Sequence, residues 1–362
     1  MLSKIMSRVG MLLIVHPAFA ESITLMGTTQ QSILRTPSFQ AGRRLPTVVH
    51  HPIQHVTLLK VKLSETAKRG VRARIHSAQF GNVTTGNPSF GNYPRQAQLG
   101  MNGVPVLDQG MHGSCVLFAT TAAVDAVIGQ GDYISQLCQL ELGTYLQNNS
   151  YALSGWDGSL GKHVAGQLEM FGIVPKSIQL KNGCAGVTEY PTGGQSASEE
   201  LSVFDYHQMS EPLGDHGVSI ETLMLPEQVN ASFQDQERLL FKIKRILNQG
   251  DRVTMGVFII GLNRGNVGAL GTHHVSNDTW VMTSQSSQDF NDEETFGLHE
   301  LIITGYDDDA IATDASGRIS RGFVTLRNSW SDQVGDQGDF YMSYSYLKAF
   351  LMEAQHIRQN RG

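Results

Sequence analysis

The chain has 362 residues, of which 40% are hydrophobic and 17% are charged, and its net charge is −6. This length and composition predict a globular protein with enough apolar residues to form the cores of two domains. Past the N-terminus, no apolar run approaches the roughly 20 residues that a membrane-spanning helix needs, which excludes a helical membrane protein.

The charge is divided unevenly along the chain. Residues 21–98 carry ten Lys or Arg and two acids, a net of +8, whereas residues 99–362 carry a net of −16. Such a division is typical of a nucleic-acid-binding tail on an acidic domain, or of two parts that bind each other. Aromatic residues are not interleaved with the basic ones, which argues against nucleic acid. We therefore expect the basic segment to dock on the acidic part.

The first twenty residues predict a signal peptide. Lys4 and Arg8 give a positive start, residues 11–15 are apolar, and Ala18-Phe19-Ala20 has the small-residue pattern of a cleavage site. We therefore expect a secreted or periplasmic protein; a frayed N-terminus is the alternative.

The basic segment at 21–92 has a short structured part. Residues 21–55 are polar and irregular. Apolar and polar residues alternate over Val56–Leu63, which predicts a strand, and Ser64 can cap a basic helix that reaches about residue 77. The stretch 81–93 is rich in Gly, Asn and Ser and predicts a linker, so we place the second domain at 93–362.

An apolar helix is predicted at 115–128, with Gly129 at its end. Ser114 is a good N-cap residue, which places Cys115 at the first helical position, where the helix dipole favours a thiolate. Gln109, on the preceding loop, can donate a hydrogen bond to an oxyanion beside the sulfur. A small buried core residue is the ordinary alternative for such a cysteine.

The rest of the chain progresses from helices to strands. Further helices are predicted from Ser159 to Phe171 and from about Gln236 to Gly250, and a surface helix at 348–361. Strands are predicted at 252–260, 279–283, 298–306, 322–327 and 339–344. This order indicates an α+β chain with a helical subdomain at about 93–205 and a β-rich subdomain at about 206–350.

The chain has three cysteines, Cys115, Cys138 and Cys184. An odd number leaves one unpaired in an oxidising compartment. Pairing Cys138 with Cys184 would leave Cys115 free, as a nucleophile requires. Three buried free thiols are the alternative.

A cysteine nucleophile needs a base, and the base needs an orienting partner. His299 opens an apolar strand, and Asn328 follows the strand at 322–327. The side-chain oxygen of Asn328 can accept a hydrogen bond from one imidazole nitrogen and so fix the tautomer. Trp330 can shield that bond from water.

These segments resemble the papain-like cysteine peptidases in their bacterial secreted form. The resemblance extends from about residue 93 to residue 350. Its motifs are Pro105-Val106, Gln109-Gly110, Gly113-Ser114-Cys115, Phe118-Ala119, His299 with Gly305-Tyr306, Asn328-Ser329-Trp330, Gly335-Asp336 and Gly338-Asp339-Phe340.

The resemblance implies a two-subdomain α+β fold. A helical subdomain bearing Cys115 would pack against an antiparallel β-barrel-like subdomain, with the active site in the cleft between them. Cys115 would be the nucleophile, His299 the general base and then acid, and Asn328 the orienting residue. Gln109 and the backbone N–H of Cys115 would form the oxyanion hole.

The resemblance also implies further features. Asp157, Gly158 and Ser159 resemble the Gly-rich wall on which substrate backbone pairs, and we place Trp330 beside them in the substrate cleft. The spacing of Cys138 and Cys184 is similar to that of a family disulfide. Because family members are made as zymogens, we expect the basic segment at 21–92 to be a prosegment that blocks the cleft.

Several positions depart from the family pattern. Val116, Glu300 and Ser331 stand where other residues are usual, and extra loops are expected at 185–235 and 261–296. A binding protein with a decayed site is therefore an alternative. Another acyl-transfer enzyme on the same scaffold, an amidase or a transpeptidase, is a second alternative.

We expect neither a metal nor an organic cofactor. The pair His273-His274 has no Cys or acid at ligand spacing, and Asp307-Asp308-Asp309 lacks the Gly and the final Glu of a calcium loop. The expected partners are protein or peptide substrates and the chain's own prosegment, without nucleic acid, and the protein is expected to be a monomer.

Overall fold

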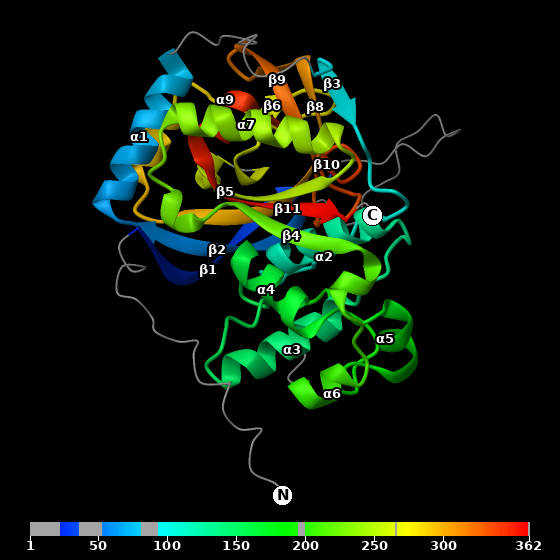
Figure 1. Ribbon diagram of the computed structural model, residues 1–362. Helices are drawn as coiled ribbons and strands as arrows, with labels where there is room; N and C mark the ends of the chain where they lie inside the picture. The colour runs from blue at the N-terminus through cyan, green and yellow to red at the C-terminus, as the bar shows by residue number, and fades with distance from the viewer. Residues whose placement is uncertain (1–21, 36–52, 81–92, 195–199, 265, 361–362) are drawn as a thin grey trace, which may run out of the picture.

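The computed structural model describes residues 22–35, 53–80, 93–194, 200–264 and 266–360. The predicted signal peptide and the predicted linker after residue 80 lie outside these ranges. An eleven-stranded sheet forms the centre of the molecule, with helices on both of its faces (Figure 1).

The main sheet has the strand order β4-β11-β5-β8-β6-β7-β10-β9. Neighbours are antiparallel except for β7 and β10. The long strand β8 also pairs with β9, so this half of the sheet curls back on itself. The bounds are β4 Val218–Met224, β5 Arg252–Ile259, β6 Gly271–Thr272, β7 Thr279–Trp280, β8 Phe296–Asp314, β9 Ile319–Arg327, β10 Asp339–Ser343 and β11 Leu351–Gln359.

The N-terminal segment joins this sheet. It forms β1 (Ile23–Leu34), β2 (Ile53–Leu63) and α1 (Glu65–Phe80). Strand β2 pairs with β1 on one side and with β8 on the other, so the predicted strand is present and lies between two others. Strand β1 was not expected, because most of its side chains are exposed or half-buried and show no alternation.

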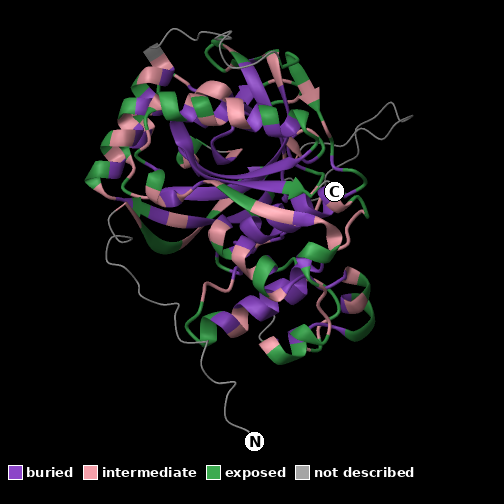
Figure 2. Ribbon diagram, viewed as in Figure 1, coloured by how far each residue is buried: buried purple, intermediate pink, exposed green. Residues whose placement is uncertain are grey.

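Apolar side chains attach this segment to the rest of the molecule. The residues that it contributes to the larger hydrophobic core are all at most 5% exposed: Ile33, Val56, Leu58, Leu59, Val61, Leu63, Ala67, Val71, Ile75 and Ala78. Arg74 is also buried and donates hydrogen bonds to the backbone carbonyls of Ala349 and Val229, rather than to carboxylates. The segment does dock on the acidic part, but its contacts are largely apolar (Figure 2).

Five helices lie together beneath the sheet (Figure 1). They are α2 Cys115–Ile128, α3 Gln136–Asn148, α4 Gly161–Phe171, α5 Lys176–Asn182 and α6 Val203–His207. Helix α2 packs against β8, β5 and β11, and it ends at Gly129 with φ 75°, as predicted. Helix α4 begins two residues after the predicted Ser159. Helix α3 was not predicted, because it buries Gln136, Gln139 and Glu141 beside its apolar residues.

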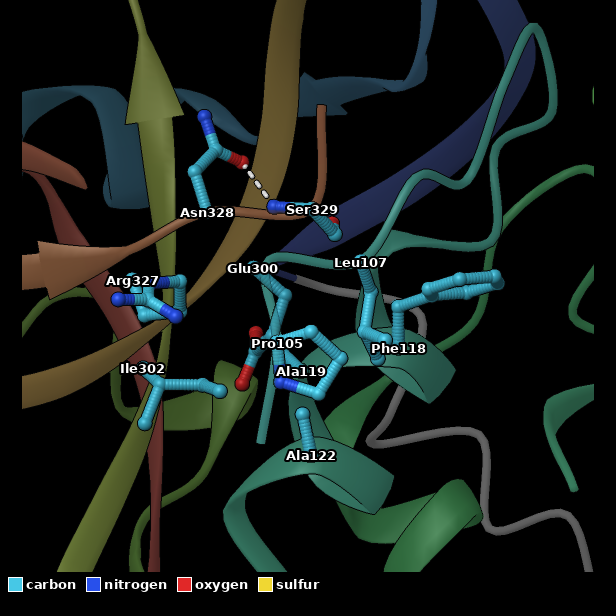
Figure 3. A pocket seen from close by; sticks show the side chains of 10 residues that line it. All are labelled: Pro105, Leu107, Phe118, Ala119, Ala122, Glu300, Ile302, Arg327, Asn328 and Ser329. Carbon is cyan, nitrogen blue, oxygen red and sulfur yellow. Dashed lines mark hydrogen bonds between the residues drawn. The ribbon is translucent and has the colours of Figure 1, made fainter. Parts of the chain in front are cut away.

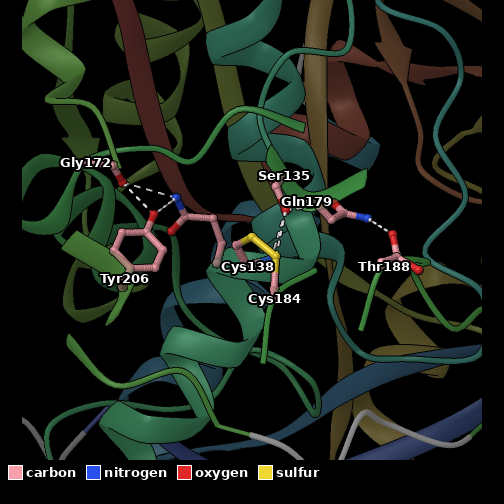
Figure 4. The surroundings of a disulfide bond; sticks show 8 residues. Ser135, Cys138, Gly172, Gln179, Cys184, Thr188 and Tyr206 are labelled. Atoms are coloured by element: carbon pink, nitrogen blue, oxygen red, sulfur yellow. Dashed lines mark hydrogen bonds between the residues drawn. A yellow bond between two sulfur atoms is a disulfide. The ribbon is translucent and has the colours of Figure 1, made fainter. Parts of the chain in front are cut away.

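A disulfide joins Cys138 of α3 to Cys184, just after α5 (Figure 4). Ser135 caps α3 by accepting from the N–H of Cys138, and its hydroxyl donates to Gln179 at 2.7 Å. Cys115 is the free cysteine, so the predicted pairing is present.

Helices α1, α7 (Phe233–Asn248) and α9 (Tyr344–Phe350) cover the other face of the sheet (Figure 1). Helix α7 begins earlier than predicted, at a capping box formed by Ser232 and Asp235. The remaining short elements are β3 Gln96–Gln98, α8 Ser286–Asp292, and single 3₁₀ turns at Leu213–His216, Pro226–Gln228, Leu262–Arg264 and Asn266–Gly268.

The predicted surface helix at 348–361 is wrong. Beyond α9 this segment is β11, which lies between β4 and β5 and is buried from Leu351 to Ile357. The polar residues of this segment indicate an exposed surface in the sequence, but in the fold they meet partners that are distant in the chain. His356, for example, lies 2.9 Å from the carboxylate of Asp251.

Candidate active site

His299 of β8 and Asn328, just after β9, form a buried hydrogen-bonded pair. The Nε2 of His299 lies 2.8 Å from the Oδ1 of Asn328. The backbone N–H of Ser329 also donates to that Oδ1, at 2.8 Å, and Figure 3 draws this bond. Because a backbone N–H can only donate, the atom it meets is the amide oxygen. The Nε2 of His299 therefore carries the hydrogen, and Nδ1 keeps a free lone pair.

The ring of His299 is shielded on one side by Trp330. The two rings are stacked, with centroids 4.1 Å apart and an interplanar angle of 17°. The Nδ1 of His299 is buried and has no hydrogen-bond partner among the described residues. Burial lowers the pKa of His299 to about 4, against the opposing effect of the bond to Asn328.

Cys115 lies in the same pocket as His299. It is the first residue of α2 and is 2% exposed. The pocket is lined by Leu59, Cys115, Val116, Gly158, Ser159, Gly256, Leu298, His299, Glu300, Met352 and Glu353. Burial raises the pKa of the Cys115 thiol to about 12, and the nearby carboxylate of Glu300 also raises it. In this state both groups are neutral at pH 7.

Gln109 is fixed at both ends of its amide. Its Oε1 accepts from the hydroxyl of Ser329 at 2.7 Å, and its Nε2 donates to the carbonyl of His112 at 2.7 Å. Ser329 thus links Gln109 to Asn328. One N–H of the Gln109 amide is left for a further acceptor.

Tyr190 holds the loop that precedes Cys115, and sequence reasoning missed it. Its hydroxyl donates to the carbonyl of Gln109 at 2.9 Å and lies 3.0 Å from the Oγ of Ser114. Ser114 accordingly does not cap α2 with its side chain, contrary to expectation. Tyr190 also stacks on Trp156, with ring centroids 5.7 Å apart. It lies in the predicted loop 185–235, where no periodicity marked it.

The backbone around Asp157, Gly158 and Ser159 lies against the segment that precedes Cys115. A Cβ on Gly113 would come within 2.9 Å of the carbonyl carbon of Asp157, so this approach requires a glycine. Ser159 and Gly158 are buried and line the pocket of Cys115, whereas Asp157 is exposed.

Strand β2 crosses this site. Leu59 pairs with Leu298, directly before His299. Its side chain lies so close to Gly158 that a Cβ there would be 2.8 Å from its Cδ1. On either side, the Oγ1 of Thr57 donates to the carbonyl of Met111 at 2.6 Å, and the Nε2 of Gln54 donates to the carbonyl of Trp330 at 3.1 Å.

Ser331 has a φ of 67°, in the left-handed region that favours glycine. This conformation lets its N–H donate to the carbonyl of Leu107 at 3.1 Å. The departure at this position therefore leaves the turn after Trp330 intact.

The described ranges contain no cluster of three or more His, Cys, Asp or Glu that could hold a metal ion. His274 instead lies 2.7 Å from Asp336, and His273 stacks on it. Asp309 of the acidic run pairs with Arg95.

Comparison with solved structures identifies the architecture. The structure is similar to that of xylellain, a cysteine protease from Xylella fastidiosa, with a TM-score of 0.50 and 18% identity over 76% of this chain and 90% of that one. The chain has the papain-like fold. A helical part packed against a sheet, as the sequence predicted, is therefore confirmed.

Other papain-like structures match at lower TM-scores. The proform of Amb a 11, a ragweed pollen allergen, has a TM-score of 0.44 and 15% identity, covering 81% of this chain and 76% of that one. Digestive procathepsin L 3 of Tenebrio molitor has a TM-score of 0.44 and 17% identity, covering 80% of this chain and 78% of that one. No protein-family model matches the sequence, and no curated protein matches it either.

Proposed function

We propose that this chain is a cysteine peptidase that hydrolyses peptide bonds through Cys115, His299 and Asn328. The observation that carries the proposal is the tautomer of His299. Because Nε2 is committed to Asn328, its free Nδ1 is a base, and it belongs to the same pocket as the one free thiol in the described chain.

The reaction begins with the transfer of the thiol proton of Cys115 to Nδ1 of His299. The thiolate adds to the peptide carbonyl carbon, and the oxygen of that carbonyl takes up the negative charge. The backbone N–H of Cys115 and the remaining amide N–H of Gln109 donate to this oxygen.

The imidazolium of His299 then gives its proton to the leaving amine, and the C–N bond breaks. An acyl thioester remains on Cys115. Neutral His299 next takes a proton from water, whose oxygen attacks the thioester carbonyl carbon. The C–S bond breaks, the acid is released, and the proton on His299 returns to the sulfur of Cys115. The bond to Asn328 keeps the ring in one orientation throughout.

Residues 53–80 act as an inhibitory prosegment in this proposal. Leu59 occupies the space between Gly158 and the histidine strand, where a substrate side chain would lie. Substrate is therefore excluded, and the neutral thiol and imidazole are kept out of water. Apolar burial of β2 and α1, more than charge, is what holds the segment in place.

The protein would act outside the cytoplasm as a secreted or periplasmic monomer. The predicted signal peptide and the Cys138–Cys184 disulfide support export. Among the described helices, none is long and apolar enough to span a membrane.

The function is tested with the full chain expressed by export, beside Cys115→Ser. Cys138→Ser/Cys184→Ser is a control that loses the two disulfide-bonded cysteines and keeps the free one. We expect casein hydrolysis and covalent labelling by an epoxide inhibitor in wild type, with neither in Cys115→Ser. The control should keep its labelling at Cys115.

Hydrolysis by Cys115→Ser would overturn the mechanism, and a wild type without hydrolysis or labelling would favour the decayed binding protein. Peptide products joined to an added amine would favour a transpeptidase.

A further inference from the structure

Two buried carboxyl groups lie side by side at the base of the candidate active site. Glu300 of β8 is the register partner of Gly256 in β5, and Gly256 is the register partner of Glu353 in β11. Register partners on antiparallel strands share a face of the sheet. Glu300 and Glu353 therefore flank a glycine on one face, the one that also borders Cys115.

The two carboxyl groups have different surroundings. Glu353 is 1% exposed and its Oε2 accepts from the N–H of Gly161 at the start of α4, at 2.9 Å. Glu300 is 2% exposed, and neither of its oxygens has a hydrogen-bond partner among the described residues. Figure 3 shows its side chain beside Pro105 and Ala119; Arg327 lines the same pocket, and its Nε donates to the carboxylate of Asp339 at 2.6 Å.

Burial is costly for such a pair, and the positive charge of Lys162 near Glu353 offsets only part of that cost. Burial raises the pKa of Glu353 to about 7. Burial raises the pKa of Glu300 well above its ordinary value, and repulsion by the carboxylate of Glu353 raises it too. Among the described residues, Glu300 has no ion-pair partner.

The side chains of Glu300 and Glu353 close over the glycine between them. A Cβ on Gly256 would lie 2.8 Å from the Oε2 of Glu300 and 2.8 Å from the Cγ of Glu353. Glu300, Glu353 and Gly256 all line the pocket that contains Cys115 and His299. In the structure the side chain of Leu59 lies against Gly158 in the wall of this pocket, and an apolar side chain cannot pair with a carboxylate.

We propose that Glu300 and Glu353 form a cation-selective floor of the substrate pocket, so that the enzyme prefers peptides presenting Lys or Arg where Leu59 now lies. The inference rests on the proposed peptidase function and names its substrate class. A guanidinium or ammonium group that entered where Leu59 now lies would meet the carboxyl oxygens of the pair. Charge-assisted hydrogen bonds of this kind are stronger than neutral ones, and a guanidinium can bind two oxygens at once.

The test compares two fluorogenic peptides that differ at one residue, arginine in one and citrulline in the other. Citrulline has nearly the shape of arginine without its charge. The processed enzyme is assayed as wild type, Glu353→Gln and Glu300→Gln. Glu293→Gln is the matched control, because Glu293 is another part-buried carboxyl whose pKa burial raises to about 7, and it accepts from the N–H of Gly261 instead of lining this pocket.

We expect wild type and the control to prefer arginine by about tenfold or more in kcat/KM, the effect of one or two charge-assisted bonds. Glu353→Gln and Glu300→Gln should each reduce the ratio of kcat/KM on arginine to kcat/KM on citrulline several-fold. Equal rates on both peptides in wild type would overturn the inference. A preference that survives in both variants would overturn it too, and would leave the pair as a structural element of the sheet.

Covalent labelling keeps the test decisive if a variant does not fold. Peptidyl chloromethyl ketones with arginine or citrulline at the same residue are reacted with wild type, and modification of Cys115 is followed by mass spectrometry. Faster labelling by the arginine reagent supports the inference, and equal labelling overturns it alone. Labelling by neither reagent, together with no hydrolysis, would overturn the proposed function as well.

Discussion

The hydroxyl of Tyr190 donates a hydrogen bond to the backbone carbonyl of Gln109 at 2.9 Å, so a residue far along the chain sets the position of the proposed oxyanion donor. The same hydroxyl lies 3.0 Å from the Oγ of Ser114, the residue before Cys115. One side chain therefore holds both flanks of the nucleophile loop. Nearby, the carbonyl of Thr192 accepts from the N–H of Met111 at 3.1 Å, a second contact between this segment and the loop before Cys115.

Tyr190→Phe should lower kcat about five- to tenfold and leave KM nearly unchanged. The variant keeps the ring that stacks on Trp156 and removes only the hydroxyl, whose hydrogen bonds are each worth about 1 kcal/mol. The loss falls on kcat because the oxyanion donors act in the transition state. Tyr151→Phe is the control, since Tyr151 is 65% exposed. A rise in KM at constant kcat would show that Tyr190 serves substrate binding instead.

Leu59→Ala should uncover Cys115 in the full chain. Shortening a buried leucine costs about 2–5 kcal/mol, and here the loss weakens the contact of β2 with Gly158. In a His299→Gln background, which prevents self-processing, iodoacetamide should alkylate Cys115 at least about tenfold faster than in the same background with Leu59 intact. Mass spectrometry of the modified peptide gives the rate.

Lys62→Ala is the matched control, because Lys62 is exposed on the same strand and carries part of the positive charge of the segment. We expect it to leave the alkylation rate unchanged. If Lys62→Ala accelerated alkylation as much as Leu59→Ala, charge would be what holds β2 in place, as the charge division of the sequence first indicated.

The sequence predicted those parts of the molecule whose signals are local. The helix Cys115–Ile128 is apolar nearly all round and is followed by a glycine, Gly129, and both features can be recognised without knowing its neighbours. Strand β2 could likewise be predicted, because apolar and polar residues alternate along part of it. His299 and Asn328 were paired through motif resemblance, whereas their hydrogen bond depends on how β8 and β9 pair.

The parts that could not be predicted depend on distant partners. Strand β11 buries Glu353 and His356, whose polar character indicates a surface in the sequence but is met by Gly161 and Asp251 in the fold. Tyr190 likewise acquires its role only when its loop folds over Gln109. In each case the decisive partner is far along the chain.

The full chain should lose stability through His299 as the pH falls. Burial lowers its folded pKa to about 4, below the ordinary value of about 6.5, so the unfolded chain binds the proton more readily. The contribution of the neutral ring is present above pH 6.5 and is lost as the pH falls towards 4. Its full size is about 3 kcal/mol.

The measurement is urea unfolding at pH 7.5 and pH 4.5, in a Cys115→Ala background, with and without His299→Gln. Several buried carboxyl groups with raised pKa act in the opposite direction, and they are common to both proteins. The difference between the two proteins therefore isolates the histidine, and we expect the protein that keeps His299 to lose more stability in acid. A difference in free energy that does not change with pH would contradict the prediction.

Removing the disulfide should destabilise the helical subdomain and spare the geometry of the proposed site. Cys138 and Cys184 are 46 residues apart, and a loop of that length gives a stabilisation of about 4 kcal/mol in the chain-entropy model. Cys138→Ser/Cys184→Ser should lower the free energy of unfolding by about that amount, measured by urea unfolding in a Cys115→Ala background. The bond between His299 and Asn328 lies in the sheet, away from this link, so epoxide labelling of Cys115 in the otherwise wild-type double variant should persist at low temperature. Loss of labelling in a protein that remains folded would show that the disulfide also positions the loop of Tyr190.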